Sequence, residues 1–314
     1  LTFGGMTAFL QLVNRIQGPA RDLTRLAPAF VSVFTAAERL MELEENPLEE
    51  QCAPIYMEAP CGIRLNEVSY GYEDGKGDII QNLSFEFPPG SCTAVLGETG
   101  AGKTTLVRLL LALVKPLRGQ VEIYDHSRKR ALSPRMRCNF VYVPQGNTLM
   151  SGTIRDNLRL GKIGATDEEM RAALHQSCAD FVFDLPDGLD TLCSEQGGGL
   201  SEGQAQRIAI ARAILKDAPI VVLDEAMAFA DAENELALRE GMAELLRGKT
   251  VLMIAHRLST IQDADLILVF KEGQIAERGT HEELVALNGI YSSMWKDYQT
   301  SIAWKVGKED EQHD

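Results

Sequence analysis

Residues 97–104 read Gly-Glu-Thr-Gly-Ala-Gly-Lys-Thr and match the phosphate-loop pattern at every fixed position. Glycines let the backbone curl, so that successive N–H groups face a β-phosphate at the positive end of the following helix. Lys103 adds a charge between the β- and γ-phosphates, and Thr104 places a hydroxyl where it can ligate Mg²⁺. The stretch therefore predicts a site for a nucleoside triphosphate.

The segments on either side of this loop predict a strand and a helix. Residues 91–96 are typical of a buried strand, and residues 104–114 of an apolar helix. A glycine-rich turn that binds nothing is the alternative, and the ordered strand, loop, lysine and helix disfavour it. Glu98 puts a carboxylate inside the loop, and we expect that carboxylate to point to solvent.

Length, composition and charge limit the classes of protein to consider. The 314 residues are 45% hydrophobic, which is enough for a globular core. A formal net charge of −14 argues against nucleic acid as a partner, because phosphate backbones bind basic surfaces. The six cysteines include no Cys-x-x-Cys pair, so we expect reduced thiols without a metal or catalytic role.

Residues 1–45 carry no signal-peptide pattern, and their apolar patches at 1–13 and 26–34 predict amphipathic helices. Gly18-Pro19 lies between the patches and predicts a kink or a break there. Because the chain opens without an initiator methionine, we expect it to be part of something longer. Prolines and acids in residues 46–62 predict a linker.

Short alternating runs follow from residue 63. Residues 64–72 and 80–87 predict strands of an antiparallel sheet, and the basic residues 128–137 predict a solvated loop. Tyr70 and Tyr72 share one face of their strand, where they can pack in the core or offer a ring to an adenine base. The pattern alone favours the core.

Residues 151–179 predict helices, one of which runs from an Asp167 cap to His175, and His175 is expected at the surface. A glycine loop at residues 196–199 then precedes a helix over residues 201–215. Ser201 and Gln204 fit a capping box, so a well-formed helix start is the simpler interpretation of that motif.

The apolar run 220–223 ends in Asp224 and Glu225, the form of a central parallel strand with carboxylates at its tip. Asp224 is expected to hold Mg²⁺, usually through water, and Glu225 to deprotonate the attacking water. A neighbouring strand over residues 250–255 delivers His256 to the same edge. Strands at 266–270 and 274–278, followed by two helices, complete the predicted fold.

These motifs, in this order over residues 63–296, resemble the nucleotide-binding domain of the ABC transporter superfamily. The resemblance implies an α/β phosphate-loop NTPase core with a mostly parallel sheet, an antiparallel β subdomain and a helical signature subdomain. It also implies domain boundaries: residues 1–45 resemble the last transmembrane helix of an exporter half-transporter, 46–62 link it to a nucleotide-binding domain at 63–300, and 301–314 form a charged tail.

The resemblance also implies roles for individual residues. Tyr72 takes the position of the ring that stacks on adenine, which reverses the preference for the core. Lys103, Glu225 and the switch histidine His256 are the implied catalytic residues, and Thr104, Gln145 and Asp224 the implied Mg²⁺ ligands. The implied ATP contacts are Tyr72, Gly97, Glu98, Thr99, Gly100, Ala101, Gly102, Lys103, Thr104, Thr105 and Gln145, and the implied signature is Leu200, Ser201, Glu202, Gly203 and Gln204.

The implied function is Mg²⁺-dependent ATP hydrolysis that drives export, on the cytoplasmic side of an inner or plasma membrane. The implied partners are the chain's own transmembrane domain and a second nucleotide-binding domain, paired head to tail so that each signature closes over the other chain's ATP. A soluble ABC ATPase is the first alternative, disfavoured by the acidic charge and by residues 1–45. A nucleotide-gated dimerisation module with little turnover is the second.

Two departures from the family pattern matter. Glu202 stands where glycine is commonest in the signature, so its carboxylate must point away from an incoming γ-phosphate. After Asp224 and Glu225 the family reads Ser-Ala-Leu-Asp, whereas this chain reads Ala228-Phe229-Ala230-Asp231. That loop crosses the dimer interface in the family, and its altered sequence motivates the second alternative.

Overall fold

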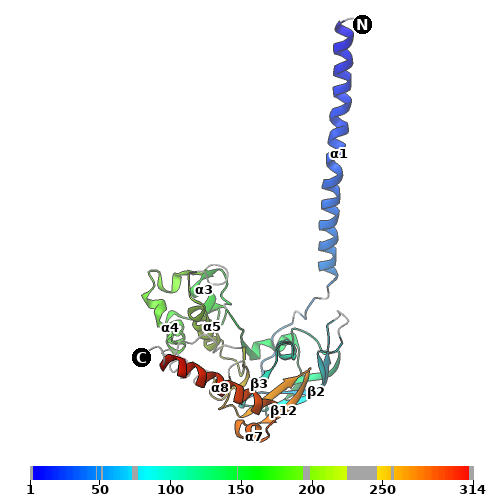
Figure 1. Ribbon diagram of the computed structural model, residues 1–314. Helices are drawn as coiled ribbons and strands as arrows, with labels where there is room; N and C mark the ends of the chain where they lie inside the picture. Colours follow the sequence, from blue (N-terminus) through cyan, green and yellow to red (C-terminus); the bar gives the residue numbers. More distant parts are fainter. Residues whose placement is uncertain are drawn as a thin grey trace. The chain divides into compact units, whose positions relative to one another are not determined.

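The computed structural model describes residues 3–46, 48–50, 52–72, 77–146, 148–193, 199–224, 246–255 and 258–310 (Figure 1). The chain divides into two compact units, residues 1–51 and residues 52–314. The first unit contains one long helix. The second contains the sheets and the remaining described helices.

Helix α1, Phe3–Glu45, is continuous through Pro19 and Pro28, so of the predicted kink or break at Gly18-Pro19 the break is wrong. Each proline removes one i→i−4 hydrogen bond, and the helix continues on both sides of Pro19 and of Pro28. Most apolar side chains of α1 are exposed. Within the described residues, the structure contains no helix whose length and apolar content suffice to span a bilayer.

A six-stranded sheet forms the centre of the second unit, in the order β12-β11-β3-β10-β9-β6. Its first five strands along the chain pair in parallel, and only β12 runs antiparallel at one edge, which confirms the mostly parallel sheet. The five parallel strands are mostly apolar and buried because both faces of the sheet are covered, whereas the edge strand β12 carries polar, exposed residues. Their bounds are β3 Cys92–Gly97, β6 Phe140–Val143, β9 Ile220–Asp224, β10 Thr250–Ile254, β11 Leu266–Lys271 and β12 Gln274–Gly279.

An antiparallel sheet in the order β2-β1-β4-β5 packs against the same core, as predicted. Its strands are β1 Gly62–Tyr70, β2 Ile80–Phe87, β4 Arg118–Tyr124 and β5 Lys129–Ala131. Helix α2, Lys103–Leu110, buries its apolar face in this shared core. The predicted basic loop at 128–137 is wrong in part, because it contains β5 and the 3₁₀ helix η1, Pro134–Asn139. Arg137 there donates to the carbonyls of Leu111 and Ala112 (2.9 and 2.6 Å).

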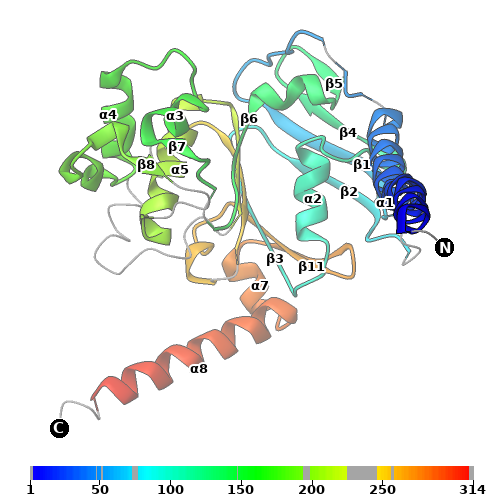
Figure 2. The same ribbon diagram turned by 90° about the horizontal axis from the view of Figure 1, so that it is seen from above.

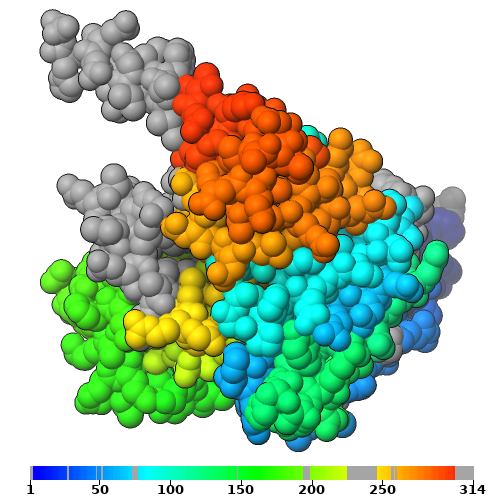
Figure 3. Space-filling model, turned by 90° about the horizontal axis from the view of Figure 1, so that it is seen from below, coloured from blue at the N-terminus to red at the C-terminus, as the bar shows by residue number. Residues whose placement is uncertain are grey.

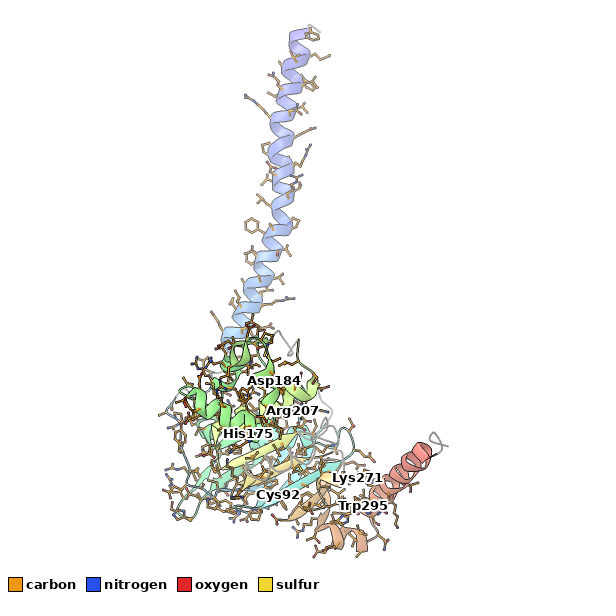
Figure 4. All side chains as sticks on the ribbon, turned by 90° about the vertical axis from the view of Figure 1, so that its left-hand side faces the viewer. Cys92, His175, Asp184, Arg207, Lys271 and Trp295 are labelled. Carbon is orange, nitrogen blue, oxygen red and sulfur yellow. The ribbon has the colours of Figure 1, made fainter. Side chains whose placement is uncertain are left out.

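A helical part with its own apolar core lies on the other side of the central sheet from α2 (Figure 2). The helix predicted from Asp167 begins there, but Thr166 is its cap, because the Thr166 hydroxyl accepts from the N–H of Glu169. Figure 4 labels three residues of this part: exposed His175, which contacts Asp180, together with Asp184 and Arg207. The elements are β7 Gly152–Thr153, α3 Ile154–Arg159, α4 Asp167–Gln176, η2 Asp180–Asp184, η3 Gly188–Asp190, β8 Leu192–Cys193 and α5 Glu202–Lys216.

The chain closes with η5 Leu258–Thr260, α7 His281–Ala286 and α8 Ile290–Asp310. Tyr291 at the start of α8 is fully buried against the edge of the central sheet. Helix α8 continues through residues 301–310, so most of the segment predicted as a charged tail is helical.

Residues 53–61, which we call the strap, lie within the predicted linker and bond to the second unit. The N–H of Ile55 donates to the carbonyl of Arg135 (2.9 Å). The side chain of Asn139, 1% exposed, accepts from the N–H of Met57 (2.8 Å) and donates to the carbonyl of Ile55 (2.7 Å). The strap therefore belongs to the folded second unit.

Asp125 fixes the other end of the strap. Burial acts to raise the pKa of this carboxyl, but hydrogen bonds from the N–H groups of Glu58, Ser127 and Arg128 outweigh burial and hold the pKa well below its usual range. Hydrogen bonds to a charged carboxylate favour the charged form in this way.

Asn139→Ala should lower the free energy of unfolding of the second unit by about 3 kcal/mol, because it leaves the buried N–H of Met57 without its partner and removes one of the donors to the carbonyl of Ile55. The control, Gln120→Ala at an exposed site on β4, should stay within about 0.5 kcal/mol of the parent. Urea unfolding followed by circular dichroism measures both, and equal losses would show that the strap adds no specific stability.

Candidate functional site

The predicted phosphate loop connects the end of β3 at Gly97 to the start of α2 at Lys103. Gly102 caps α2 with a left-handed backbone at φ 104°. A Cβ on Gly97 would lie 2.4 Å from the carbonyl oxygen of Phe270, so only glycine fits there. The loop thus aims the N-terminal N–H groups of α2 at its own concave side, as phosphate binding requires.

Lys103 is 8% exposed and bends back over the loop. Its Nζ donates to the carbonyl of Gly97 (2.6 Å) and to the carbonyl of Glu98 (3.0 Å). The Glu98 side chain is exposed, as expected for a carboxylate that must avoid phosphate.

The register of the central sheet brings the other predicted residues to this loop. Leu223 pairs with Val143, and Asp224 pairs with Ile254, so β6, β9 and β10 end at one edge of the sheet. A pocket of about 630 Å³ opens at this edge. Its lining is Ile79, Thr99, Gly100, Gly102, Lys103, Thr104, Thr105, Gln145, Asp224 and Ile254.

The donor groups of this pocket fit a magnesium-bound triphosphate. Thr104, Gln145 and Asp224 offer hydroxyl, amide and carboxylate oxygens, the hard ligands that Mg²⁺ prefers. Lys103 supplies the positive charge that phosphate oxygens require. Among the described residues no group of three or more His, Cys, Asp or Glu could hold a metal by itself, and the six cysteines are free thiols.

Sequence reasoning missed Tyr142. Its hydroxyl donates to Oδ2 of Asp224 (3.2 Å), and burial, together with the charge of Asp224, raises the pKa of Tyr142, which keeps it a donor. The contact fixes one oxygen of the carboxylate at the pocket. The available signal was a single polar-tipped side chain in the otherwise apolar strand β6.

Tyr72 lies past the end of β1 and outside the core cluster, whereas Tyr70 packs against that cluster. Arg108 on α2 donates to the Tyr72 hydroxyl (2.6 Å), and its guanidinium carbon lies 5.9 Å from the ring centre. The core interpretation therefore holds for Tyr70 only. Tyr72 remains partly exposed and does not line the phosphate pocket.

The five predicted signature residues, 200–204, lie at the start of α5. The Ser201 hydroxyl accepts from the N–H of Gln204 (3.2 Å), and the Gln204 side chain accepts from the N–H of Ser201 (2.9 Å), which confirms the capping box. Leu200 packs against the helical core, and Glu202 is exposed. None of the five lines the phosphate pocket of this chain.

Glu225, His256 and the altered loop at 228–231 lie outside the described residues, as do residues 196–198 of the glycine loop. The strands before them are described. β9 ends at Asp224, and its neighbour β10 ends at Ile254, so both chain segments leave the sheet at the pocket edge.

Comparisons of sequence and structure with known proteins all find ABC transporters. Residues 80–228 match the sequence profile of the family described as "ABC transporter". An uncharacterized ABC transporter ATP-binding protein of Bacillus subtilis is 36% identical over 300 residues, which are 94% of this chain and 50% of that protein. An ATP-dependent lipid A-core flippase of Coxiella burnetii is 36% identical over 299 residues, 94% of this chain and 51% of the flippase.

A solved structure of a bacterial Atm1-family ABC exporter with ATP bound superposes with a TM-score of 0.76 at 35% identity, over 84% of this chain and 47% of the exporter. The chain spans about half the length of the curated relatives it matches.

Proposed function

Because residues 80–228 are an ABC transporter domain, we propose that the chain is the ATP-binding and ATP-hydrolysing part of an exporter. The observation that carries the proposal is the pocket that gathers Lys103, Thr104, Gln145 and Asp224 from three separate segments. A triphosphate needs a cation, a metal ligand and helix N–H groups at one place, and this pocket supplies all three.

In this mechanism the phosphate loop holds ATP, and Lys103 stabilises the charge that develops on the β- and γ-phosphates. Thr104, Gln145 and Asp224 would hold Mg²⁺, which neutralises phosphate charge when bound, and Tyr142 orients Asp224. Glu225 takes the proton of the attacking water, and His256 holds that water in line with the γ-phosphate. Water attacks phosphorus, and the oxygen of ADP leaves.

We propose that two such domains pair head to tail and that the chain acts with a transmembrane domain, on the cytoplasmic side of an inner or plasma membrane. Ser201 supports the pairing, because it lies outside the phosphate pocket of its own chain and a partner must bring the second signature. The exporter and flippase names of the relatives support the membrane location.

The altered sequence at residues 228–231 favours one second candidate, a module that dimerises on ATP with little turnover. Phosphate release by the parental chain with saturating Mg-ATP distinguishes the two: steady release supports the enzyme, and ATP binding without release supports the module.

Glu225→Gln should keep ATP binding and lose about 10²- to 10⁴-fold in turnover, the usual contribution of a positioned general base. Phosphate release at saturating Mg-ATP measures the rate. Glu168→Gln, an exposed carboxylate on α4, should keep the parental rate. Chelating Mg²⁺ should stop turnover in every variant, whereas hydrolysis by Glu225→Gln at the parental rate would exclude Glu225 as the base.

Tyr72→Ala should weaken ATP binding by about 2- to 10-fold, because a ring contact contributes roughly 0.5–1.5 kcal/mol, and should leave saturated turnover nearly unchanged. Tyr72→Phe is the matched control, since it keeps the ring and removes only the hydroxyl that Arg108 contacts. Titration with a fluorescent ATP analogue measures affinity. Normal affinity with a large fall in turnover would place Tyr72 in the chemistry or the fold instead.

Mixing two inactive variants tests the head-to-tail pair. Lys103→Ala removes phosphate binding, and Ser201→Arg blocks the signature, so each homodimer should be inactive. A mixed dimer has one sound site, and random pairing should restore about one quarter of the parental rate. Adding Glu225→Gln to the Ser201→Arg chain destroys that one site and should abolish the recovery. A mixture at background, with the parental chain active and dimeric, would contradict the shared site.

A further inference from the structure

The last residues of β11 and the turn from β11 to β12 contact both ends of the phosphate loop, although they supply no residue to the phosphate pocket. We call residues 270–273 the support turn. At one end, the carbonyl oxygen of Phe270 lies so close to Gly97 that a Cβ there would be 2.4 Å away. At the other end, the N–H of Gly273 donates to the carbonyl of Ala101 (3.1 Å).

Gly273 also packs against, and bonds to, the segment that enters β2. Its φ is +77°, and a Cβ on it would lie 2.0 Å from the carbonyl oxygen of Ile79. Its own carbonyl accepts from the N–H of Gln81 (3.2 Å). In Figure 3 the orange surface of the β11-β12-α7 region lies directly against the cyan surface of the β2 region.

The segment that enters β2 also contacts the phosphate loop. A Cβ on Gly102 would lie 3.0 Å from Cδ1 of Ile80 and 3.3 Å from the carbonyl oxygen of Ile79. Ile79 itself lines the phosphate pocket. The phosphate loop, the β2 entry and the support turn therefore each contact the other two. A shift of one of them would disturb the other two.

A cavity of about 710 Å³ borders the loop beside these contacts. Lys271 and Glu272 of the support turn and Ile290 and Met294 of α8 form part of its wall, together with Glu98. Figure 4 labels Lys271 and Trp295, which lie on this C-terminal side of the unit. On this side the loop borders the cavity, and the backbone contacts of the support turn lie beside it.

We propose that Gly273 is a positioning residue for the phosphate loop: it holds Ala101 and the β2 entry so that the loop N–H groups and Lys103 stay aligned for a triphosphate. The inference rests on the proposed ATP binding. Gly273 acts through the backbone, so any side chain at this position should disturb the loop without touching the nucleotide.

Gly273→Ala should weaken ATP binding at least tenfold, because a displaced loop loses charge-assisted hydrogen bonds to phosphate. Gly119→Ala is the matched control. Gly119 has a φ of +73°, and its Cβ would lie 2.3 Å from the carbonyl oxygens of Asn66 and Glu67, so it carries similar strain on β4, away from the pocket. Both variants should melt earlier, but Gly119→Ala should bind ATP as the parent does.

ATP titration of the full chain measures the affinity of each variant, and thermal melting measures its stability. Parental affinity in Gly273→Ala, or an equal loss in both variants, overturns the positioning role. If the parental chain itself does not bind ATP, the proposed function fails instead, which keeps the two failures distinct.

Hydrogen exchange on the parental chain gives a second measurement that does not depend on the folding of a variant. Saturating ATP should slow exchange of the Gly273 N–H, which bonds the loop, more than exchange of the Gly90 N–H, which bonds Thr250. Equal responses of the two amides to ATP would overturn the proposal.

Discussion

Parallel pairing of β3, β10, β9 and β6 in one register determines where the chemistry of this chain can occur. Because the strands run in the same direction, their carboxyl ends meet at one edge, and Asp224, Ile254 and Gln145 at or just past three of these ends line the same pocket. A shift of one residue between β9 and β10 would turn Asp224 toward the opposite face of the sheet. The fully buried apolar side chains of these strands oppose such a shift, since it would move them as well.

Local patterns predicted much of this arrangement. The strands beside the phosphate loop, the antiparallel sheet and the helix from Ser201 were readable because each depends on neighbouring residues. Lys103, Thr104, Gln145 and Asp224 line one pocket, and their roles there stay predictions. The strap was not readable. Asn139 bonds to Met57 across 82 residues, and no periodicity records a contact between one side chain and a distant backbone.

The errors have similar physical causes. The prolines of α1 each cost one hydrogen bond of a long helix and do not break it, and the cap of α4 depends on which of two adjacent polar residues has an extended backbone. At Ser201 the capping box and the predicted signature are compatible. Capping uses a lone pair of the hydroxyl as acceptor and leaves its proton for another partner.

The strap has a consequence for protein engineering. Consider a chimera that joins the second unit to a foreign domain at residue 62, where the first strand begins. It would discard the nine residues of the strap, and Asn139 would lose its hydrogen bonds to Met57 and Ile55. A junction placed within residues 46–51, between α1 and the strap, keeps every one of those bonds. Grafts of this unit should therefore carry the strap with it.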